Sequence, residues 1–242
     1  MKYIDAHCHL QDAGLNIAAT IRRAESENVV GYICNSAAQT DWHNVITLCN
    51  QYPSVHGCIG IHPWHINNLS DDWQSQLINI LSDNPTLMVG EIGIDNNYPN
   101  TETQIDIFNA QIDIAYKLHR PAHIHCVGAW DKMLHIFKSR IRRMPPTIVL
   151  HSFAGPSDII NQCADKYNAY FSYSPMILDS RRHRLHNAVL NTPTSRILCE
   201  SDCADPSVVP DVVSAVAQIK ILDHNKLADI IYNNTLMVLK YG

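Results

Sequence analysis

The chain has 242 residues, a formal net charge of −5 at pH 7 and 46% hydrophobic residues. This length and composition allow one large hydrophobic core, and the acidic balance excludes a protein that attracts nucleic acid through its overall charge. No run of about 18 apolar residues occurs, which excludes a membrane-spanning helix, and the N-terminus lacks the layout of a signal peptide. We therefore expect one soluble domain over residues 1–242, located in the cytoplasm and not bound to a membrane.

Eight cysteines are scattered singly along the chain, without a Cys-x-x-Cys pair. Several of them, such as Cys34, Cys58 and Cys199, fall inside apolar runs. We therefore expect reduced, mostly buried thiols rather than disulfides. The fourteen histidines are the unusual feature of the composition, and their positions decide what they indicate.

Short apolar segments bounded by turn residues follow one another along the chain and predict eight β-strands. In chain order they are Tyr3–Ala6, Val29–Cys34, His56–Ile61, Leu87–Ile92, Ala122–His125, Ile148–Leu150, Ala169–Ser172 and Arg196–Cys199. The segments between them are long enough for helices. In one of these segments Ile105, Phe108, Ile112, Ala115 and Leu118 fall on one helical face.

Strands and helices that alternate in this way predict an α/β protein with a parallel sheet covered by helices. Eight such units in a chain close to the roughly 250 residues typical of the class favour a closed (β/α)8 TIM barrel. A doubly wound open sheet is the alternative, although no Gly-x-Gly-x-x-Gly motif follows the first strand. In a barrel, the functional side chains lie at the C-terminal ends of the strands.

Side chains that can bind a metal ion occupy these strand ends. They are His7 and His9, His62, Glu91, His125, His151 and Asp202, which end or follow the first, third, fourth, fifth, sixth and eighth strands. The spacing of His7 and His9 puts both imidazoles on one face of an extended segment, where two nitrogens can approach one ion at about 2.0–2.1 Å. Asp5 lies on the same face and either orients an imidazole or is simply a polar residue beneath the site.

Each of these residues alone has an ordinary structural explanation. A pair of histidines can lie in a solvent-exposed loop, and His125 or His151 can be a hydrogen-bonded core residue. Glu91 directly follows an apolar run, so burying it unpaired would cost several kcal/mol, and either a metal ion or a structural salt bridge is expected nearby. Because the candidates recur at equivalent points of different units, we favour a shared metal centre.

The motifs that carry a family resemblance stand in a fixed order along the chain. They are "DAHCHL", "GIHPWH", "VGEIGID", "ETQIDIFNAQIDIAYKLHRP", "IHC", "IVLHSFAG" followed by "AYFSYSP", and "ILCESD". With them the chain resembles the TatD-type metal-dependent deoxyribonucleases, a branch of the amidohydrolase-like TIM barrels, over nearly its whole length. The resemblance implies two divalent metal ions, one held by His7, His9 and Asp202, the other by His125 and His151, with Glu91 bridging them.

The resemblance also implies roles around the metal centre. It puts His62 near the substrate phosphate, and we expect His65 of the same motif to bind substrate as well. Glu200, kept in "ESD" where the family usually has "ETD", is expected to support the ligands together with Asp5. Val127 is a departure, since the family usually has an arginine after "IHC" that would clamp a phosphate or carboxylate.

A metal pair about 3.5–4 Å apart activates water and neutralises charge on the group under attack. Asp202 is the expected general base and Glu91 the residue that sets the metal spacing. The mixed ligands suit Zn, Mg, Mn, Fe or Co. Cys8, Cys126 and Cys203 flank ligand positions and are interpreted as small packing residues.

Two further features lie on the expected active face. Arg181, Arg182 and Arg184 form a basic cluster that either follows a nucleic-acid backbone or is a solvated helix surface. Trp64 and Trp130 are expected in loops, where they either stack on a base or pack over the barrel mouth.

The leading hypothesis is a TatD-like deoxyribonuclease of exonuclease type that hydrolyses phosphodiester bonds in single-stranded DNA or at frayed ends. The first alternative, motivated by Val127 and the acidic net charge, is a two-metal hydrolase of a small ester, lactone or amide. The second is a barrel that binds metal or a partner without turnover. No obligate protein partner is indicated.

Overall fold

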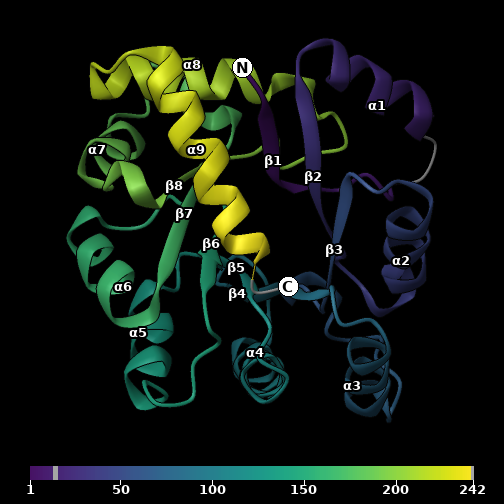
Figure 1. Ribbon diagram of the computed structural model, residues 1–242. Helices are drawn as coiled ribbons and strands as arrows, with labels where there is room; N and C mark the ends of the chain where they lie inside the picture. Colours follow the sequence, from purple (N-terminus) through teal and green to yellow (C-terminus); the bar gives the residue numbers. More distant parts are fainter. Residues whose placement is uncertain (13–15, 241–242) are drawn as a thin grey trace.

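The computed structural model describes residues 1–12 and 16–240 (Figure 1). One parallel sheet contains eight strands, each paired with the next in chain order. The strands are β1 (Tyr3–Cys8), β2 (Val29–Asn35), β3 (Val55–Ile59), β4 (Met88–Asp95), β5 (Ala122–Val127), β6 (Ile148–Leu150), β7 (Ala169–Tyr173) and β8 (Ile197–Cys199). The predicted TIM barrel is confirmed.

Helices surround the sheet. They are α1 (Ile17–Ser26), α2 (Trp42–Gln51), α3 (Trp73–Asp83), α4 (Thr101–Lys117), α5 (Trp130–Ser139), α6 (Ile160–Tyr167), α7 (His183–Asn191), α8 (Val209–Lys220) and α9 (His224–Leu239). Short 3-10 helices are η1 (Gln39–Asp41), η2 (Pro63–His65), η3 (Ser157–Ile159), η4 (Pro175–Leu178), η5 (Thr194–Arg196) and η6 (Pro206–Val208). The predicted apolar face of α4 is buried at Phe108, Ile112 and Ala115.

Only β6 has the predicted bounds, and the ends of the other strands differ from the prediction by one to three residues. Two of these differences affect the site. β3 ends at Ile59, because the backbone of Ile61 bonds instead to the side chain of Gln111, whose Oε1 and Nε2 lie 2.7 and 3.2 Å from its N and O atoms. β4 continues to Asp95, because its last three residues pair with the end of β5. Asp95 is therefore held on a strand beside the site rather than in a loop.

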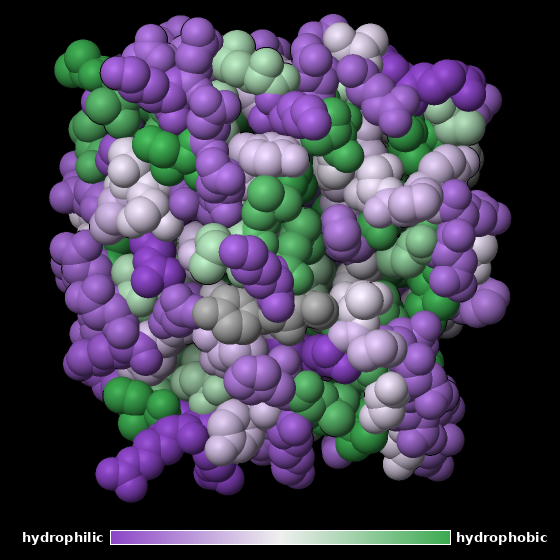
Figure 2. Space-filling model, viewed as in Figure 1, coloured by the Kyte–Doolittle hydropathy of each residue, from purple (hydrophilic) through white to green (hydrophobic). Residues whose placement is uncertain are grey.

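The interior of the barrel has its own apolar core, separate from the larger one between strands and helices. Seven strands contribute to it: Ala6, Ile33, Cys58, Met88, Val149, Tyr170 and Leu198 are buried together. Val238 and Leu239, at the end of α9, pack against this core, so the last helix covers one end of the barrel. In Figure 1, α9 crosses in front of the strands, and hydrophobic residues lie near the middle of this otherwise largely hydrophilic face in Figure 2.

The barrel closes without a regular ladder between its first and last strands. Within the described part of the chain, each strand pairs with the next from β1–β2 to β7–β8, and β8 forms no ladder with β1. The residues after β8 close the gap instead: the amide of Asp202 donates to the carbonyl oxygen of His7 (3.0 Å), and the amide of His9 donates to that of Cys203 (2.9 Å). This closure brings the two ends of the sheet together at the candidate metal ligands.

Among residues 1–12 and 16–240, no helix combines the length and the apolar character that a bilayer crossing requires. All eight cysteines are free thiols, and only Cys203 among them is exposed.

Candidate metal centre

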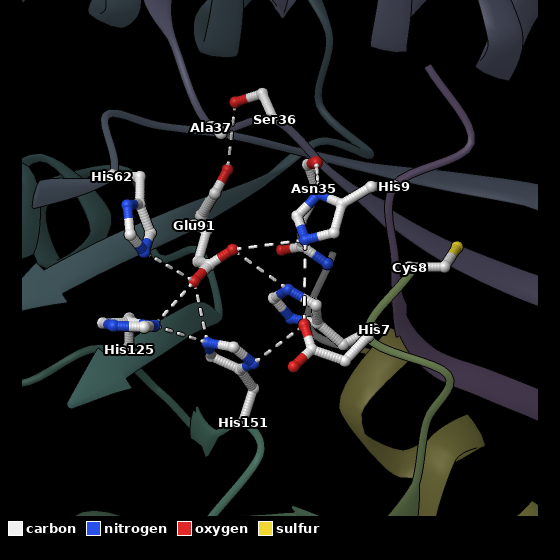
Figure 3. Close-up of polar contacts among 12 residues, drawn as sticks. His7, Cys8, His9, Asn35, Ser36, Ala37, His62, Glu91, His125 and His151 are labelled. Atoms are coloured by element: carbon white, nitrogen blue, oxygen red, sulfur yellow. Dashed lines mark hydrogen bonds and ion pairs between the residues drawn. The ribbon is translucent and has the colours of Figure 1, made fainter. Parts of the chain in front are cut away.

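The carboxylate of Glu91 lies at the centre of a ring of histidines (Figure 3). Glu91 belongs to β4 and its side chain is almost fully buried. Its Oε2 lies 3.2 Å from Nε2 of His7 and 3.5 Å from Nε2 of His9. Its Oε1 lies 3.2 Å from Nε2 of His62, 3.0 Å from Nδ1 of His125 and 2.8 Å from Nε2 of His151. One carboxylate therefore faces five imidazoles from four segments of the barrel.

The hydrogen bonds of His9 leave its second nitrogen free for a cation. Its Nδ1 lies 2.9 Å from the carbonyl oxygen of Asn35, which can only accept, so Nδ1 carries the proton of the neutral ring. Its Nε2 then presents an electron pair toward Oε2 of Glu91 at 3.5 Å and Oδ1 of Asp202 at 3.8 Å. Three electron-pair donors that face one another in this way suit a shared cation, and their chemistry fits a divalent metal ion.

A second group of donors forms around His125. Its Nδ1 lies 3.2 Å from Nε2 of His151, and both nitrogens face the same oxygen of Glu91. Its Nε2 points to Oδ2 of Asp95 at 3.4 Å. In the neutral ring of His125, a proton on Nε2 donates to Asp95. Nδ1 is then an electron-pair donor toward Glu91.

His62 differs from these rings. It lies past the end of β3 and caps η2, and its Nδ1 accepts a hydrogen bond from the amide of Trp64 (3.1 Å). Burial lowers the pKa of His62, so the neutral ring carries its proton on Nε2 and donates toward Glu91. In this arrangement His62 is a hydrogen-bond donor to Glu91, and its expected role near the substrate phosphate stays a prediction.

The charges of the centre are strongly coupled. Burial by itself would raise the pKa of Glu91, but the facing His151, His62 and His125 hold it well below its ordinary value. Burial opposes protonation of His151, but the surrounding carboxylates outweigh it and hold its pKa well above its ordinary value. Burial and the neighbouring His151 ring hold the pKa of His7 well below its ordinary value. The protein therefore keeps an ionised buried carboxylate that needs positive charge beside it.

Asp202 reaches the centre from the segment after β8. Its backbone has a positive φ of 53°, a left-handed conformation that aspartate tolerates better than most residues. Its side chain is 32% exposed, with Oδ1 3.8 Å from Nε2 of His9 and 3.9 Å from Nδ1 of His151. Asp202 is thus the most solvent-accessible carboxylate of the centre.

Glu200 and Asp5 support the centre from below. Oε1 of Glu200 accepts from the amide of Ser152 (2.7 Å), and its other oxygen accepts from the hydroxyl of Ser172. Oδ1 of Asp5 accepts from the amides of His7 (3.1 Å) and Ser201 (2.9 Å). The hydrogen bonds of Asp5 thus go to the backbone on both sides of the barrel closure rather than to an imidazole ring.

A pocket of about 330 Å³ opens above the centre. Its lining consists of His9, Asp12, Ala37, His62, Trp64, His65, Glu91, His125, His151 and Asp202. His65 is exposed at the rim and does not contact Glu91. No arginine or lysine of the described residues lines the pocket, and the cluster of Arg181, Arg182 and Arg184 lies outside it.

The structure therefore brings together all six predicted metal ligands, and donor atoms of His7, His9 and Asp202 lie within 4.8 Å of one another as the resemblance implies. Their assignment as ligands stays a prediction. Asp95 was not predicted from the sequence, although this buried carboxylate contacts both His125 and Trp64. It stands four residues after Glu91 in the same motif, and residues at this spacing on a strand share one face, so the sequence could have indicated it.

A family model described as TatD related DNase matches residues 4–240. The chain belongs to the TatD family. This TatD-family chain is 25% identical to an uncharacterized metal-dependent hydrolase of Methanocaldococcus jannaschii, over 99% of the chain and 98% of the relative. It is also 25% identical to the 3'-5' ssDNA/RNA exonuclease TatD of Erwinia tasmaniensis, over 90% of the chain and 94% of the relative.

Solved structures agree on the fold of this TatD-family chain. The crystal structure of YjjV, a TatD homolog from Escherichia coli K12, superposes with a TM-score of 0.91 at 22% identity, covering 98% of the chain and 97% of the homolog. A TatD-family hydrolase from Entamoeba histolytica superposes with a TM-score of 0.85 at 19% identity, covering 98% of each chain. The resemblance inferred from the motifs is confirmed.

Val127 is the last residue of β5 and is 36% exposed. It lies two residues after His125, so the two side chains fall on the same face of the strand. In this TatD-family chain a hydrophobic surface therefore occupies the position of the expected arginine.

Proposed function

We propose that this protein is a divalent-metal-dependent hydrolase of phosphodiester bonds, and specifically an exonuclease on single-stranded DNA or frayed ends. Membership of the TatD family and the relatives named 3'-5' ssDNA/RNA exonuclease support the proposal. The observation that carries it is the buried carboxylate of Glu91, with imidazole nitrogens of five histidines within 3.5 Å, beneath an open pocket.

We assign one ion to His7, His9 and Asp202, and a second to His125 and His151, with Glu91 shared between them. Bound divalent cations supply Lewis acidity, which neutralises charge on a phosphate and makes water an effective nucleophile near neutral pH. Imidazole and carboxylate donors suit Zn, Mn, Fe, Co and Mg, so each of these metals belongs in the test.

The protein's own groups then have distinct tasks. Asp202, the most exposed carboxylate of the centre, accepts the proton of the attacking water as general base. Glu91 keeps the two donor groups at a fixed separation because each of its oxygens faces one of them. We place His62 on the substrate side: its Nε2–H points to Glu91 in this structure and would turn to a phosphate oxygen of the substrate when bound ions hold that carboxylate.

The test is exonuclease activity on end-labelled single-stranded DNA with each metal supplied in turn. Asp202→Asn is expected to lower kcat by about 10²–10⁴-fold, and Glu91→Gln to lower activity at least as far. Asp229→Asn, an exposed acid of α9, is the matched control and should retain wild-type activity. Full activity of Asp202→Asn would contradict the assigned mechanism.

A small neutral ester, lactone or amide is the second candidate substrate. The observation that favours it is the absence of arginine and lysine from the pocket lining formed by the described residues. Metal-dependent turnover of a neutral ester, with no cleavage of single-stranded DNA or RNA, would replace the nuclease assignment by this one.

We also propose a cytoplasmic location. Its support is the set of eight free thiols, seven of them wholly or partly buried, which suits a reducing compartment.

A further inference from the structure

Two half-exposed aromatic rings stand at the mouth of the pocket. The rings of Trp64 and Tyr98 stack with their centroids 5.0 Å apart and an interplanar angle of 26°. Their exposed fractions are 49% and 41%, high values for large rings that already contact each other. The pair therefore presents a preformed aromatic surface to solvent.

The pair adjoins the candidate metal centre. Trp64 lines the pocket, and its ring centroid lies 4.6 Å from that of His62 and 6.3 Å from that of His125. A group that rests on the pair thus lies next to His62, which is expected near the substrate phosphate, and close to the proposed metal ligand His125.

Hydrogen bonds hold the Trp64 ring in place. Its Nε1 donates to Oδ2 of Asp95 (2.9 Å), and Oδ1 of Asp95 accepts from the amide of Asn97 (2.8 Å). The amide of Tyr98 donates to the carbonyl oxygen of Asp95 (3.2 Å). Asp95 therefore positions the ring of Trp64 and the backbone of Tyr98.

Trp130, the other tryptophan expected on this face, has a different role. It begins helix α5 instead of lying in a loop, and its ring packs edge-on against Phe153 at 5.0 Å. It also fills the space beside Gly155, where an added Cβ would meet the Trp130 ring at 2.6 Å. The packing interpretation applies to Trp130, which leaves Trp64 as the candidate for contact with substrate.

We propose that Trp64 and Tyr98 form a stacking surface for an unpaired nucleobase of the substrate, next to the phosphodiester that is cleaved. The inference rests on the proposed nuclease function and adds that the substrate carries an unpaired base next to its phosphate. Stacking on aromatic rings holds single-stranded nucleic acid with little sequence preference, because every base has a π-face. In a pocket without arginine or lysine, this contact supplies binding that does not depend on charge.

The experiment compares a single-stranded thymidine oligonucleotide with a matched oligonucleotide whose terminal residues lack bases. On the normal substrate, Tyr98→Ala should raise KM roughly tenfold with little change in kcat. On the abasic substrate the wild type should already show the raised KM, and Tyr98→Ala should add nothing to it. Tyr98 makes no side-chain hydrogen bond to the metal centre, so its replacement tests stacking without disturbing Asp95.

The matched variants separate stacking from structure. Tyr98→Phe keeps the ring and should restore the wild-type KM, whereas Trp64→Phe keeps a ring but removes the donor to Asp95. Tyr116→Ala removes a ring of nearly equal exposure, 40%, on α4 and should leave both substrates unaffected. Equal KM values of the wild type for normal and abasic substrates would overturn the stacking proposal while leaving the nuclease function intact.

Equilibrium binding decides the proposal independently of turnover. In the Asp202→Asn background with metal present, the normal oligonucleotide should bind roughly tenfold more tightly than the abasic one, and Tyr98→Ala should abolish the difference. If the wild type cleaves no nucleic acid, the proposed nuclease function is wrong. The binding comparison still tests the stacking surface in that case. Tighter binding of the normal oligonucleotide supports the surface, and equal binding of the two oligonucleotides overturns it.

Discussion

Oε1 of Glu200 lies 3.6 Å from Nδ1 of His151, below the ring nitrogen that faces Glu91. The same oxygen accepts the amide hydrogen of Ser152, so the carboxylate is held in one orientation beneath the imidazole. A carboxylate beside a ligating imidazole increases the basicity of the ring.

Replacement of Glu200 should therefore weaken metal binding without removing a ligand. We expect Glu200→Gln to lower metal affinity by roughly 10–100-fold, because the amide cannot supply the negative charge beneath His151. Titration of the metal-free protein with Zn²⁺ or Mn²⁺ by calorimetry measures the change. An unchanged dissociation constant would show that Glu200 only accepts hydrogen bonds from Ser152 and Ser172 and does not act on the metal ligands.

Removal of metal should lower the thermal stability of the protein. A ligand that binds only the folded state stabilises it by about 2.7 kcal/mol at a hundred times its Kd, which corresponds to a Tm increase of roughly 5–10 °C for a chain of this size. Thermal unfolding with chelator and with each metal measures the increase. Glu91→Gln should lose most of it, and an equal increase in that variant would place the stabilising ion elsewhere.

His123 should be replaceable by an apolar residue with a gain in stability. It pairs in register with Val149 of the inner core, it is fully buried, and both of its ring nitrogens lack a hydrogen-bond partner. Burial lowers its pKa to about 3, so the ring is neutral. Because a buried unpaired polar group costs about 1–3 kcal/mol, His123→Leu should raise the free energy of unfolding by a similar amount in urea denaturation.

The control for this substitution is His43→Leu on the exposed face of α2, which should change stability by less than about 0.5 kcal/mol. A loss of stability in His123→Leu would indicate that an ordered water satisfies the ring.

An arginine introduced at Val127 should improve binding of phosphodiesters. The side chain lies on the same face of β5 as His125 and is 36% exposed, so a guanidinium there has room to reach the pocket. A charge-assisted hydrogen bond is worth about 1.5–3 kcal/mol, so Val127→Arg should lower KM for single-stranded DNA by roughly tenfold or more. Val127→Met adds length without charge and should leave KM unchanged; an equal decrease in both variants would reject the electrostatic explanation.

Much of the fold and of the ligand set follows from periodic features of the sequence. The two-residue spacing of His7 and His9 and the position of Glu91 after an apolar run depend only on local strand geometry, so both could be predicted. The shared position at the C-terminal ends of the strands then follows from the barrel itself.

Contacts between distant segments could not be predicted in this way. The link from Trp64 through Asp95 to His125 joins residues from three different parts of the chain, and it exists because β4 continues two residues past Gly93 along β5. The packing of Val238 into the inner core likewise depends on where the last helix crosses the barrel, which no local pattern specifies.

The way the barrel closes has a mechanical consequence. The segment after β8 is joined to the first strand and to His9 by single hydrogen bonds at Asp5, His7 and His9 rather than by a ladder. The barrel wall can therefore open most easily at this place. An ion shared by His7, His9 and Asp202 would link the first strand to the segment after β8 at this place. We expect the amides of Asp202 and His9 to exchange with deuterium much more slowly when metal is bound. Metal binding would then make both the barrel wall and the reaction centre more rigid.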